Sequence, residues 1–359
     1  MQTRGAASDI GDEKSLPAIP YFEVDGPLDL LTRVPAATVA DLVAAGRDHY
    51  GALPMRVGEW LSQRWLARST SPYRHEVQEV TARLSMSGGA LLNLSYEWSC
   101  SSAAAADPEG GGNRLLRTLD WPLPGLGRHV VVARHDGPAG PWYNVTWPGF
   151  VGVLTAMAPG RFSVAINQPP MRRFTPAFAV DWLCNRIKVW QSHAMPPSHL
   201  LRLVCETAHD YRQAKTLLQT QPICIPAFFI LSGLHAHEGC IVERLETAAA
   251  VHEDQPACMT NHWRGFTIPS RLRGEDTHAR LAQLVAVANG NSRGFAWVQP
   301  PILNPTTRLA TVANALRRTL SVQGFEAGGA ATRPFSLPEP RPAETRGTKS
   351  TRQAESPAP

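Results

Sequence analysis

A single cysteine, Cys100, stands near the start of the segment YEWSCSSAAAADPEGGGNRLLRTLDW. A run of small residues and a glycine-rich turn follow it, and then Arg117 and Asp120 stand three positions apart. An isolated cysteine is most often a small buried hydrophobe. The functional alternative is a cysteine nucleophile, which needs a base, a group that stabilises an oxyanion, and groups that orient both.

Cleavage of the peptide bond before Cys100 would supply the base. The new α-amino group, with a typical pKa of about 8, would lie within reach of its own thiol. If the segment forms a hairpin, its second strand runs back antiparallel and returns Arg117 and Asp120 to the cysteine. A nearby guanidinium favours the thiolate, and a carboxylate can hold the amine. The plain alternative for this Arg and Asp is an exposed ion pair at the end of a hairpin.

The residues before Cys100 are predicted to be mainly helical. Apolar residues recur at three-to-four spacing in 36–51 and 55–69, and a third helix is expected over 72–86. The apolar and aromatic segment ALLNLSYEWSC is predicted to be a strand. Cys100 is therefore expected at or just beyond the end of that strand.

After the hairpin, short apolar runs between Gly/Pro turns predict consecutive antiparallel strands over 129–168. The pattern is helical from about 178 to 218, and strands resume over 226–263. One more helix and a final pair of strands close the fold at about Glu326. This order predicts an α+β sandwich in which two sheets lie between helical layers.

These patterns predict a division of the chain into four segments. Residues 1–20 are expected to be a loose leader, and 21–99 a helical region that becomes the α fragment after self-cleavage. Residues 100–326 form the predicted catalytic domain, the β fragment. The tail over 327–359 has few large apolar residues and is expected to be disordered.

Composition narrows the class of protein. The chain has 359 residues, 43% of them hydrophobic, which can furnish a sizeable core. Its net charge of +5 is spread along the chain, which argues against a nucleic-acid partner. The first 20 residues do not resemble a secretory signal, so a cytoplasmic location is expected. The longest apolar run, IPAFFIL, is too short to cross a bilayer, so no integral membrane segment is predicted.

Neither a metal nor a cofactor is expected. His235, His237 and Cys240 are possible zinc ligands, but three donors at one turn without a second cluster are more often incidental. The six cysteines show no CxxC spacing and are expected to be free thiols. Four tryptophans could line an acyl pocket, although core packing is the better explanation for most of them: Trp142, Trp147, Trp182 and Trp190.

The segment from Cys100 to Trp121 resembles the start of the catalytic chain in the acid ceramidase and N-acylethanolamine acid amidase group. This group belongs to the choloylglycine hydrolase family of N-terminal-nucleophile hydrolases, which have a Cys, a hairpin, and an Arg-x-x-Asp followed by an aromatic residue. Further segments resemble the family in the same order: WPGFVGVLTAMAPGRFSVAINQ, IPAFFILSGLHAHEGCIVER, MTNHW and PPILNPTTRLATVANALRRTLSVQGFE. The resemblance covers roughly Cys100 to Glu326.

The resemblance implies an αββα sandwich of two antiparallel sheets and a set of site residues. Cys100 would be the nucleophile, with Arg117 and Asp120 as its orienting partners. Asn261 would lie near the reacting carbonyl, where an amide donor can stabilise the oxyanion. Asn167, at the end of a predicted strand, is a second candidate donor, and both asparagines have a plain alternative as turn residues.

A later arginine of the family maps near Arg271 or Arg273, and Arg271 is our choice. Four departures from the family pattern stand out. Gln168 lies where several ceramidase-like enzymes place a Glu, so a proton relay through that position would be altered. Thr118 and Ser101 replace the usual Asn and Thr, and neither change removes a proposed catalytic group. Because the secretory signal of the lysosomal relatives is absent, an acidic pH optimum is not expected.

These features predict a hydrolase that cuts itself before Cys100 and then cleaves the linear amide of an N-acylated amine such as a ceramide or an N-acylethanolamine. Its partners would be this small-molecule N-acyl amide and the two self-associated fragments. An acyltransferase of the penicillin acyltransferase type is the nearest alternative. A non-catalytic binding protein with the same fold is another, although the intact Cys100, Arg117, Asp120 and Asn261 argue against it.

Overall fold

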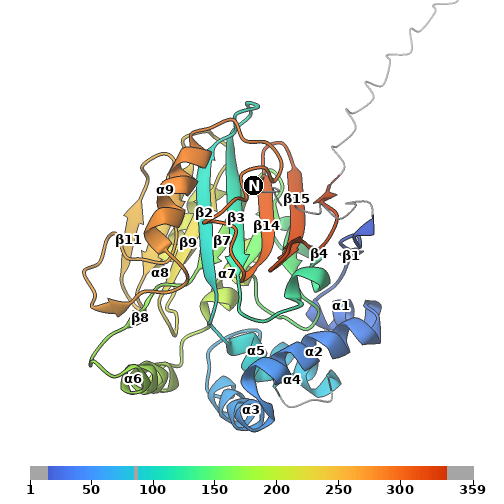
Figure 1. Cartoon of the computed structure of the whole chain (residues 1–359), viewed down its shortest axis with the longest axis vertical. Coiled ribbons are helices and arrows are strands. Elements are labelled where there is room, and N and C mark those ends of the chain that lie inside the picture. Colours follow the sequence, from blue (N-terminus) through green and yellow to red (C-terminus); the bar gives the residue numbers. More distant parts are fainter. Residues whose placement is uncertain (1–14, 85–87, 338–359) are drawn as a thin grey trace, which may run out of the picture.

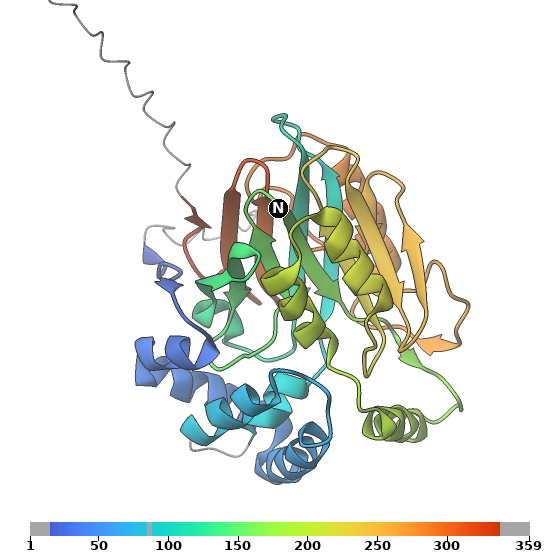
Figure 2. The ribbon, with the colours of Figure 1, turned by 180° about the vertical axis from the view of Figure 1, so that it is seen from behind.

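Two large β-sheets lie face to face at the centre of the computed structural model, which describes residues 15–84 and 88–337. Helices cover the outer face of each sheet (Figures 1 and 2). The predicted αββα architecture is thereby confirmed.

The first sheet has eight strands in the order β1-β4-β5-β6-β7-β9-β10-β11. Its neighbours pair antiparallel except β1, which pairs parallel with β4, so this edge differs from the purely antiparallel sheet that was predicted. The strands are β1 (Tyr21–Glu23), β4 (Val131–Gly137), β5 (Gly140–Thr146), β6 (Thr155–Ala158), β7 (Phe162–Asn167), β9 (Ala227–Ser232), β10 (Gly239–Arg244) and β11 (Ala249–His252).

The second sheet follows the order β12-β2-β3-β14-β15-β16, and β17 also pairs with β15. The strands are β2 (Ser99–Ala106), β3 (Asn113–Asp120), β12 (Ala257–Met259), β14 (Thr307–Asn314), β15 (Thr319–Glu326), β16 (Gly329–Ala330) and β17 (Phe335–Ser336). A separate two-stranded ladder joins β8 (Met171–Arg172) to β13 (Ser270–Arg271).

The helices form two covering layers and one terminal group. α7 and α8 pack on the first sheet, and α9 packs on β2 and β12 of the second. The N-terminal helices gather at one end of the sandwich, and α6 also lies at that end (Figures 1 and 2). The helices are α1 (Pro27–Arg33), α2 (Ala36–Tyr50), α3 (Ala52–Leu66), α4 (Arg74–Arg83), α5 (Gly89–Leu94), α6 (Phe178–Gln191), α7 (Pro197–Thr207), α8 (Tyr211–Thr220), α9 (Thr277–Ala288) and the 3-10 helix η2 (Leu126–His129).

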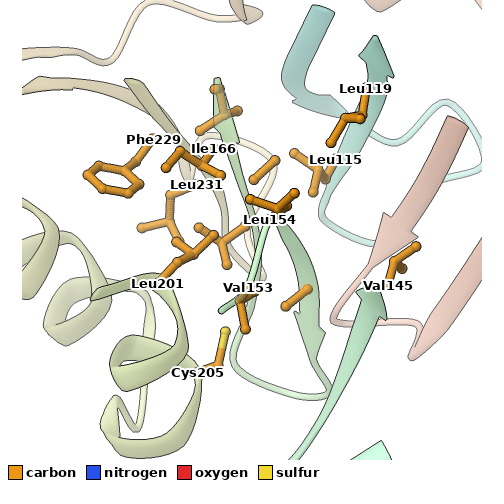
Figure 3. Close-up of a cluster of buried hydrophobic side chains, with 14 of the residues drawn as sticks. Leu115, Leu119, Val145, Val153, Leu154, Ile166, Leu201, Cys205, Phe229 and Leu231 are labelled. Carbon is orange, nitrogen blue, oxygen red and sulfur yellow. The ribbon is translucent and has the colours of Figure 1, made fainter. Parts of the chain in front are cut away.

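The main core fills the space between the two sheets and extends under α7 (Figure 3). Leu115 and Leu119 of β3 belong to it, together with Ile166 of β7, Phe229 of β9 and Leu201 of α7, and all are almost fully buried. Burial of each such side chain stabilises the fold by about 1.5–3 kcal/mol. This core holds β2 and β3 rigidly against the first sheet.

Strand β2 is built almost entirely from small residues, which lets it pack closely on both faces. Successive side chains of a strand point to opposite faces. Cys100 and Ala104 therefore lie in the core between the sheets, whereas Ala103 and Ala105 lie in the cluster under α9. The alternation turns the cysteine toward the inside of the sandwich.

The segment before Cys100 differs from its predicted strand. Its first half is the helix α5, and Cys100 is the second residue of β2 instead of lying at a strand end. Gly88, with φ 119°, precedes the helix, and the buried Asn93 side chain fixes it by donating to Gly89 O and Gly149 O, both over 2.9 Å. The apolar residues of α5 thus pack on α3 and α4 instead of pairing in a sheet.

Parts of the predicted leader and tail belong to the fold. Ile19 is buried, and the backbone N–H of Arg333 donates to Pro17 O over 2.9 Å. Phe335 of β17 stacks on Tyr21, with ring centroids 6.2 Å apart. The described chain therefore stays ordered beyond the predicted edge at Glu326, because these apolar side chains find partners. Residues 1–14 and 338–359 lie outside the described residues.

Candidate active site

The Cys100 thiol lies in the sealed interior of the sandwich, with no exposed surface. Ser99 and Cys100 both pair with β3. Arg117 Nη2 donates to Cys100 Sγ over 3.4 Å, and the thiol faces Ile166 O at 3.7 Å. The cysteine thus contacts a strand of each sheet.

Arg117 is brought to the cysteine by the hairpin register, which sets it opposite Ser102 on β2. It is fully buried, and its Nη2 also donates to Ile166 O over 2.9 Å. Nε and Nη1 have no hydrogen-bond partner among the described residues. Burial lowers the pKa of this guanidinium, while the Cys100 thiol and Asp120 oppose the shift.

Burial raises the pKa of Cys100 to about 11, against the smaller lowering effect of Arg117. Asp120 adds to the increase, and Arg280 opposes it. The thiol is therefore protonated at neutral pH in the uncut chain. A reactive thiolate needs either a base at this site or access to water.

Asp120 ends β3 and lies opposite Ser99, the residue before the predicted cleavage point. Its Oδ1 accepts a hydrogen bond from Thr307 Oγ1 over 2.8 Å, and its Oδ2 accepts a longer one from Ser99 Oγ over 3.4 Å. Arg280 Nη1 lies 3.7 Å from Oδ2. Burial raises the pKa of this carboxyl, and the charge of Arg280 opposes the increase.

Asn261 reaches the cysteine from the loop after β12. Its Oδ1 accepts a hydrogen bond from the backbone N–H of Cys100 over 3.0 Å and another from Arg280 Nη2 over 2.9 Å. Its Nδ2 donates to Gln168 O over 2.8 Å. The asparagine therefore holds the nitrogen of the bond that self-cleavage would break.

Asn167 lies close by but contacts other groups. Its Oδ1 accepts from Ser102 Oγ over 2.7 Å, and its Nδ2 donates to the carbonyl oxygens of Met259 and Thr260 over 3.0 and 3.2 Å. These bonds link the end of β7 to both β2 and β12. The arrangement anchors the loop that carries Asn261, and among the described residues no hydrogen bond joins the Asn167 amide to Cys100.

Arg271 is not brought to the nucleophile. Its Nε donates to Asp181 Oδ2 over 2.7 Å, and its Nη2 donates to the carbonyl oxygens of Thr175 and Pro176. These contacts tie β13 to the segment that leads into α6. The side chain lies beside a surface cavity instead of beside Cys100.

Arg280, which the sequence analysis did not single out, is the arginine that contacts the Cys100 main chain. Its Nη1 donates to the carbonyl oxygen of Cys100 over 2.8 Å and to Ser101 Oγ over 3.2 Å. It is fully buried in the first turns of α9. A signal was present, because Arg280, Leu284 and Ala288 recur at i, i+4 and i+8 and form the buried face of that helix.

A cavity of about 480 Å³ opens beside this site. Its walls combine apolar side chains such as Phe178, Trp182 and Ile225 with several arginines. Gly274 also lines it, and a Cβ built on Gly274 would lie 2.6 Å from Ser99 Oγ. Ser99 therefore stands between Gly274 at the cavity wall and the buried Cys100.

The remaining candidates fall outside this site. His235 and His237 stack with ring centroids 5.7 Å apart, and no group of three or more His, Cys, Asp or Glu side chains within 15–84 and 88–337 could hold a metal ion. Trp142 and Trp147 are core residues, whereas Trp182 lines the cavity. No helix in the described part of the chain is long and apolar enough to span a membrane.

Two stacked sheets lie between helical layers, and this arrangement is the αββα sandwich predicted from the sequence. A cysteine lies at the start of a central strand, and an arginine and an aspartate return to it on the hairpin partner. The chain is a relative of acid ceramidase and N-acylethanolamine-hydrolysing acid amidase. It is 28% identical over 222 residues to the N-acylethanolamine-hydrolysing acid amidase of Cavia porcellus, and this alignment covers 60% of this chain and 58% of that protein.

It is also 32% identical over 204 residues to the acid ceramidase of Bos taurus, covering 50% of this chain and 49% of that protein. The chain thus spans about half the length of these relatives. Among solved structures, the Caenorhabditis elegans N-acylethanolamine-hydrolysing acid amidase orthologue has a TM-score of 0.48 at 21% identity, covering 67% of this chain and all of that one. No protein-family model matches the chain.

Proposed function

We propose that this chain is a cysteine amidohydrolase that cleaves the linear amide of an N-acylated amine after cutting itself before Cys100. One observation carries the proposal. Asn261 and Arg280 hold the backbone on either side of the Cys100 α-carbon, through its N–H and its carbonyl oxygen. Any buried main-chain group needs a hydrogen-bond partner, but here both partners are polar side chains brought from outside β2, and they also bond each other.

In the proposed self-cleavage, Cys100 Sγ attacks the carbonyl carbon of Ser99. The C–N bond breaks as a thioester forms, and the released nitrogen takes up a proton. Water then hydrolyses the thioester, leaving a carboxylate on Ser99 and a free thiol and α-amine on Cys100. The Ser99 carboxylate would face the carboxyl of Asp120, and their repulsion would move it aside and open Cys100 toward the cavity.

In the proposed turnover, the freed α-amine, held by Asn261 Oδ1, takes the thiol proton as Sγ attacks the acyl carbon. The substrate amine leaves with that proton, and water then resolves the acyl thioester. Arg117 would stabilise the thiolate, and Asp120 would hold the ammonium form of the amine. Asn261 Nδ2 carries a second hydrogen besides the one donated to Gln168 O, and it would donate this hydrogen to the oxyanion.

The fragments would remain associated after cleavage. Arg202 of α7 pairs with Glu76 of α4 at 2.5 Å and with Glu206 at 2.8 Å, and Tyr73 Oη donates to Glu206 over 2.5 Å. These contacts lie between residues 73–76 and α7, on opposite sides of the cleavage point. The half-buried network and the surrounding core would keep the two pieces together.

Denaturing gels and amino-terminal sequencing test the self-cleavage. We expect two bands, the larger starting at Cys100, and a single band for Cys100→Ala. Hydrolysis of ceramides, N-acylethanolamines, N-acyl amino acids, bile-salt conjugates and penicillins tests the activity. A fully active protein that stays uncut would refute the proposed base. Transfer of the acyl group to an added amine would identify an acyltransferase, and no labelling by an acyl-directed electrophile would identify a binding protein.

A further inference from the structure

Arg273 lines the cavity with a charged side chain that forms no close ion pair in the described part of the chain. Its Nε donates to Pro169 O over 3.3 Å, and within residues 15–84 and 88–337 its guanidinium has no ion-pair partner within 4.0 Å. Burial lowers the pKa of this guanidinium to about 10, with Glu97 opposing and Arg186 reinforcing the shift. This half-buried group is therefore a cation at neutral pH.

The other arginines at the cavity wall are paired. Arg172 makes a bidentate bond with Glu246, both contacts at 2.6 Å, and Arg271 pairs with Asp181 at 2.7 Å. Arg186 lies 3.8 Å from Glu97. With each of these arginines matched by a carboxylate, Arg273 leaves the cavity with an excess of one positive charge. A single anion of a bound molecule would balance it.

Arg273 stands very close to the proposed reaction centre. Its chain neighbour Gly274 packs against Ser99. Arg273 itself donates to the carbonyl oxygen of Pro169, and the preceding residue, Gln168, accepts a hydrogen bond from Asn261. The apolar part of the cavity wall, including Phe178 and Trp182, belongs to α6. A bound molecule with an anion next to its scissile amide and an apolar chain along α6 would fill both the charged and the apolar part of the cavity.

We propose that Arg273 binds a carboxylate on the amine portion of the substrate, so that the preferred substrates are N-acyl amino acids. This inference rests on the proposed amidohydrolase function. In an N-acylglycine the carboxylate is separated from the amide nitrogen by one carbon, which suits a cation beside the cleavage point. The acyl chain then lies along the apolar wall, away from the charge.

The first experiment measures binding to Cys100→Ala, which keeps the chain uncut as described. N-lauroylglycine should bind about 10- to 100-fold more tightly than its neutral amide, N-lauroylglycinamide, as expected for a charge-assisted hydrogen bond. Adding Arg273→Gln should reduce the ratio of the two affinities to near one, and adding Arg273→Lys should retain part of the preference for N-lauroylglycine. Arg128→Gln removes the same charge from an exposed site outside the cavity and should keep the full ratio.

Equal binding of the two ligands, or no binding of either, would overturn the inference, and so would a ratio that survives Arg273→Gln. Laurate binding as tightly as N-lauroylglycine would assign Arg273 to the carboxylate of the fatty-acid product and would also overturn it. The second experiment measures hydrolysis by the unsubstituted protein. Selective binding of N-lauroylglycine without hydrolysis of any amide would refute the proposed function while leaving the anion site standing.

Discussion

The guanidinium of Arg280 donates to the carbonyl oxygen of Cys100 over 2.8 Å, across a separation of 180 residues in the chain. The same guanidinium bonds Asn261 Oδ1, which in turn accepts from the Cys100 N–H. The cysteine backbone is thus held in a closed ring of three residues. Because all three are fully buried, this ring is formed only in the folded chain.

Arg280→Gln should abolish self-cleavage and amide hydrolysis in molecules that still fold. Loss of the guanidinium leaves Asp120 without its nearest cation and frees the Cys100 carbonyl, at a cost of about 3–5 kcal/mol in the free energy of unfolding. Arg244→Gln is the matched control, because Arg244 is also fully buried but donates to main-chain carbonyls far from the site, among them Gln221 O. A control that loses processing as completely would show that instability alone explains the effect.

Asn261→Ala should lower the rate of amide hydrolysis by roughly 100-fold if its Nδ2 donates to the oxyanion. The loss should appear in kcat, since the hydrogen bond strengthens as charge develops on the oxygen. Steady-state kinetics with a soluble N-acyl amide would measure it. An effect confined to KM would assign Asn261 to substrate binding.

Gly274→Ala should block self-cleavage by pushing Ser99 away from its position. A Cβ at 274 would lie 2.6 Å from both Cβ and Oγ of Ser99, and the backbone there has φ +71°. Gly160→Ala is the matched control, since Gly160 has φ +70° but no atom within 4 Å of the added Cβ. Both variants bear the strain of a left-handed backbone, about 1–2 kcal/mol. Equal processing of both variants would show that close packing on Ser99 is unimportant.

The fold should lose stability as the pH falls below about 6.5. Burial, with a further contribution from Arg202, lowers the pKa of His199 to about 3. The unfolded chain then binds a proton that the folded chain does not, so this contribution is complete above the ordinary histidine pKa and is lost as the pH falls toward 3. For one such histidine, lowering the pH by two units below 6.5 reduces the free energy of unfolding by about 3 kcal/mol.

Denaturant titrations at pH 6.5 and 4.5 would measure this loss, and His199→Asn should reduce it. Substitution of the exposed His235 serves as the control. Unchanged stability at pH 4.5 would contradict the expectation. His199 Nδ1 bonds Ser71 Oγ at 2.7 Å across the two proposed fragments, so acid should also weaken their association.

The hairpin chemistry could be predicted from the sequence because it is local. An antiparallel turn of small and glycine residues returns the second strand along the first, so the return of Arg117 and Asp120 to the start of the first strand follows from chain order. The αββα layers were predictable for a similar reason, since periodicity distinguishes strands from helices. The segment before Cys100 was predicted wrongly because a short apolar run fits a strand and a buried helix equally well.

The sequence by itself determined the cysteine, its two hairpin partners and the order of layers around them, because these depend on residues near one another in the chain. Only the tertiary structure decided that Arg280 approaches Cys100 while Arg271 pairs with Asp181. These two arginines lie nine positions apart, and their surroundings differ because α9 packs its buried face on β2 whereas β13 pairs with β8 near α6. Packing between distant segments fixes such contacts, and no spacing along the chain encodes it.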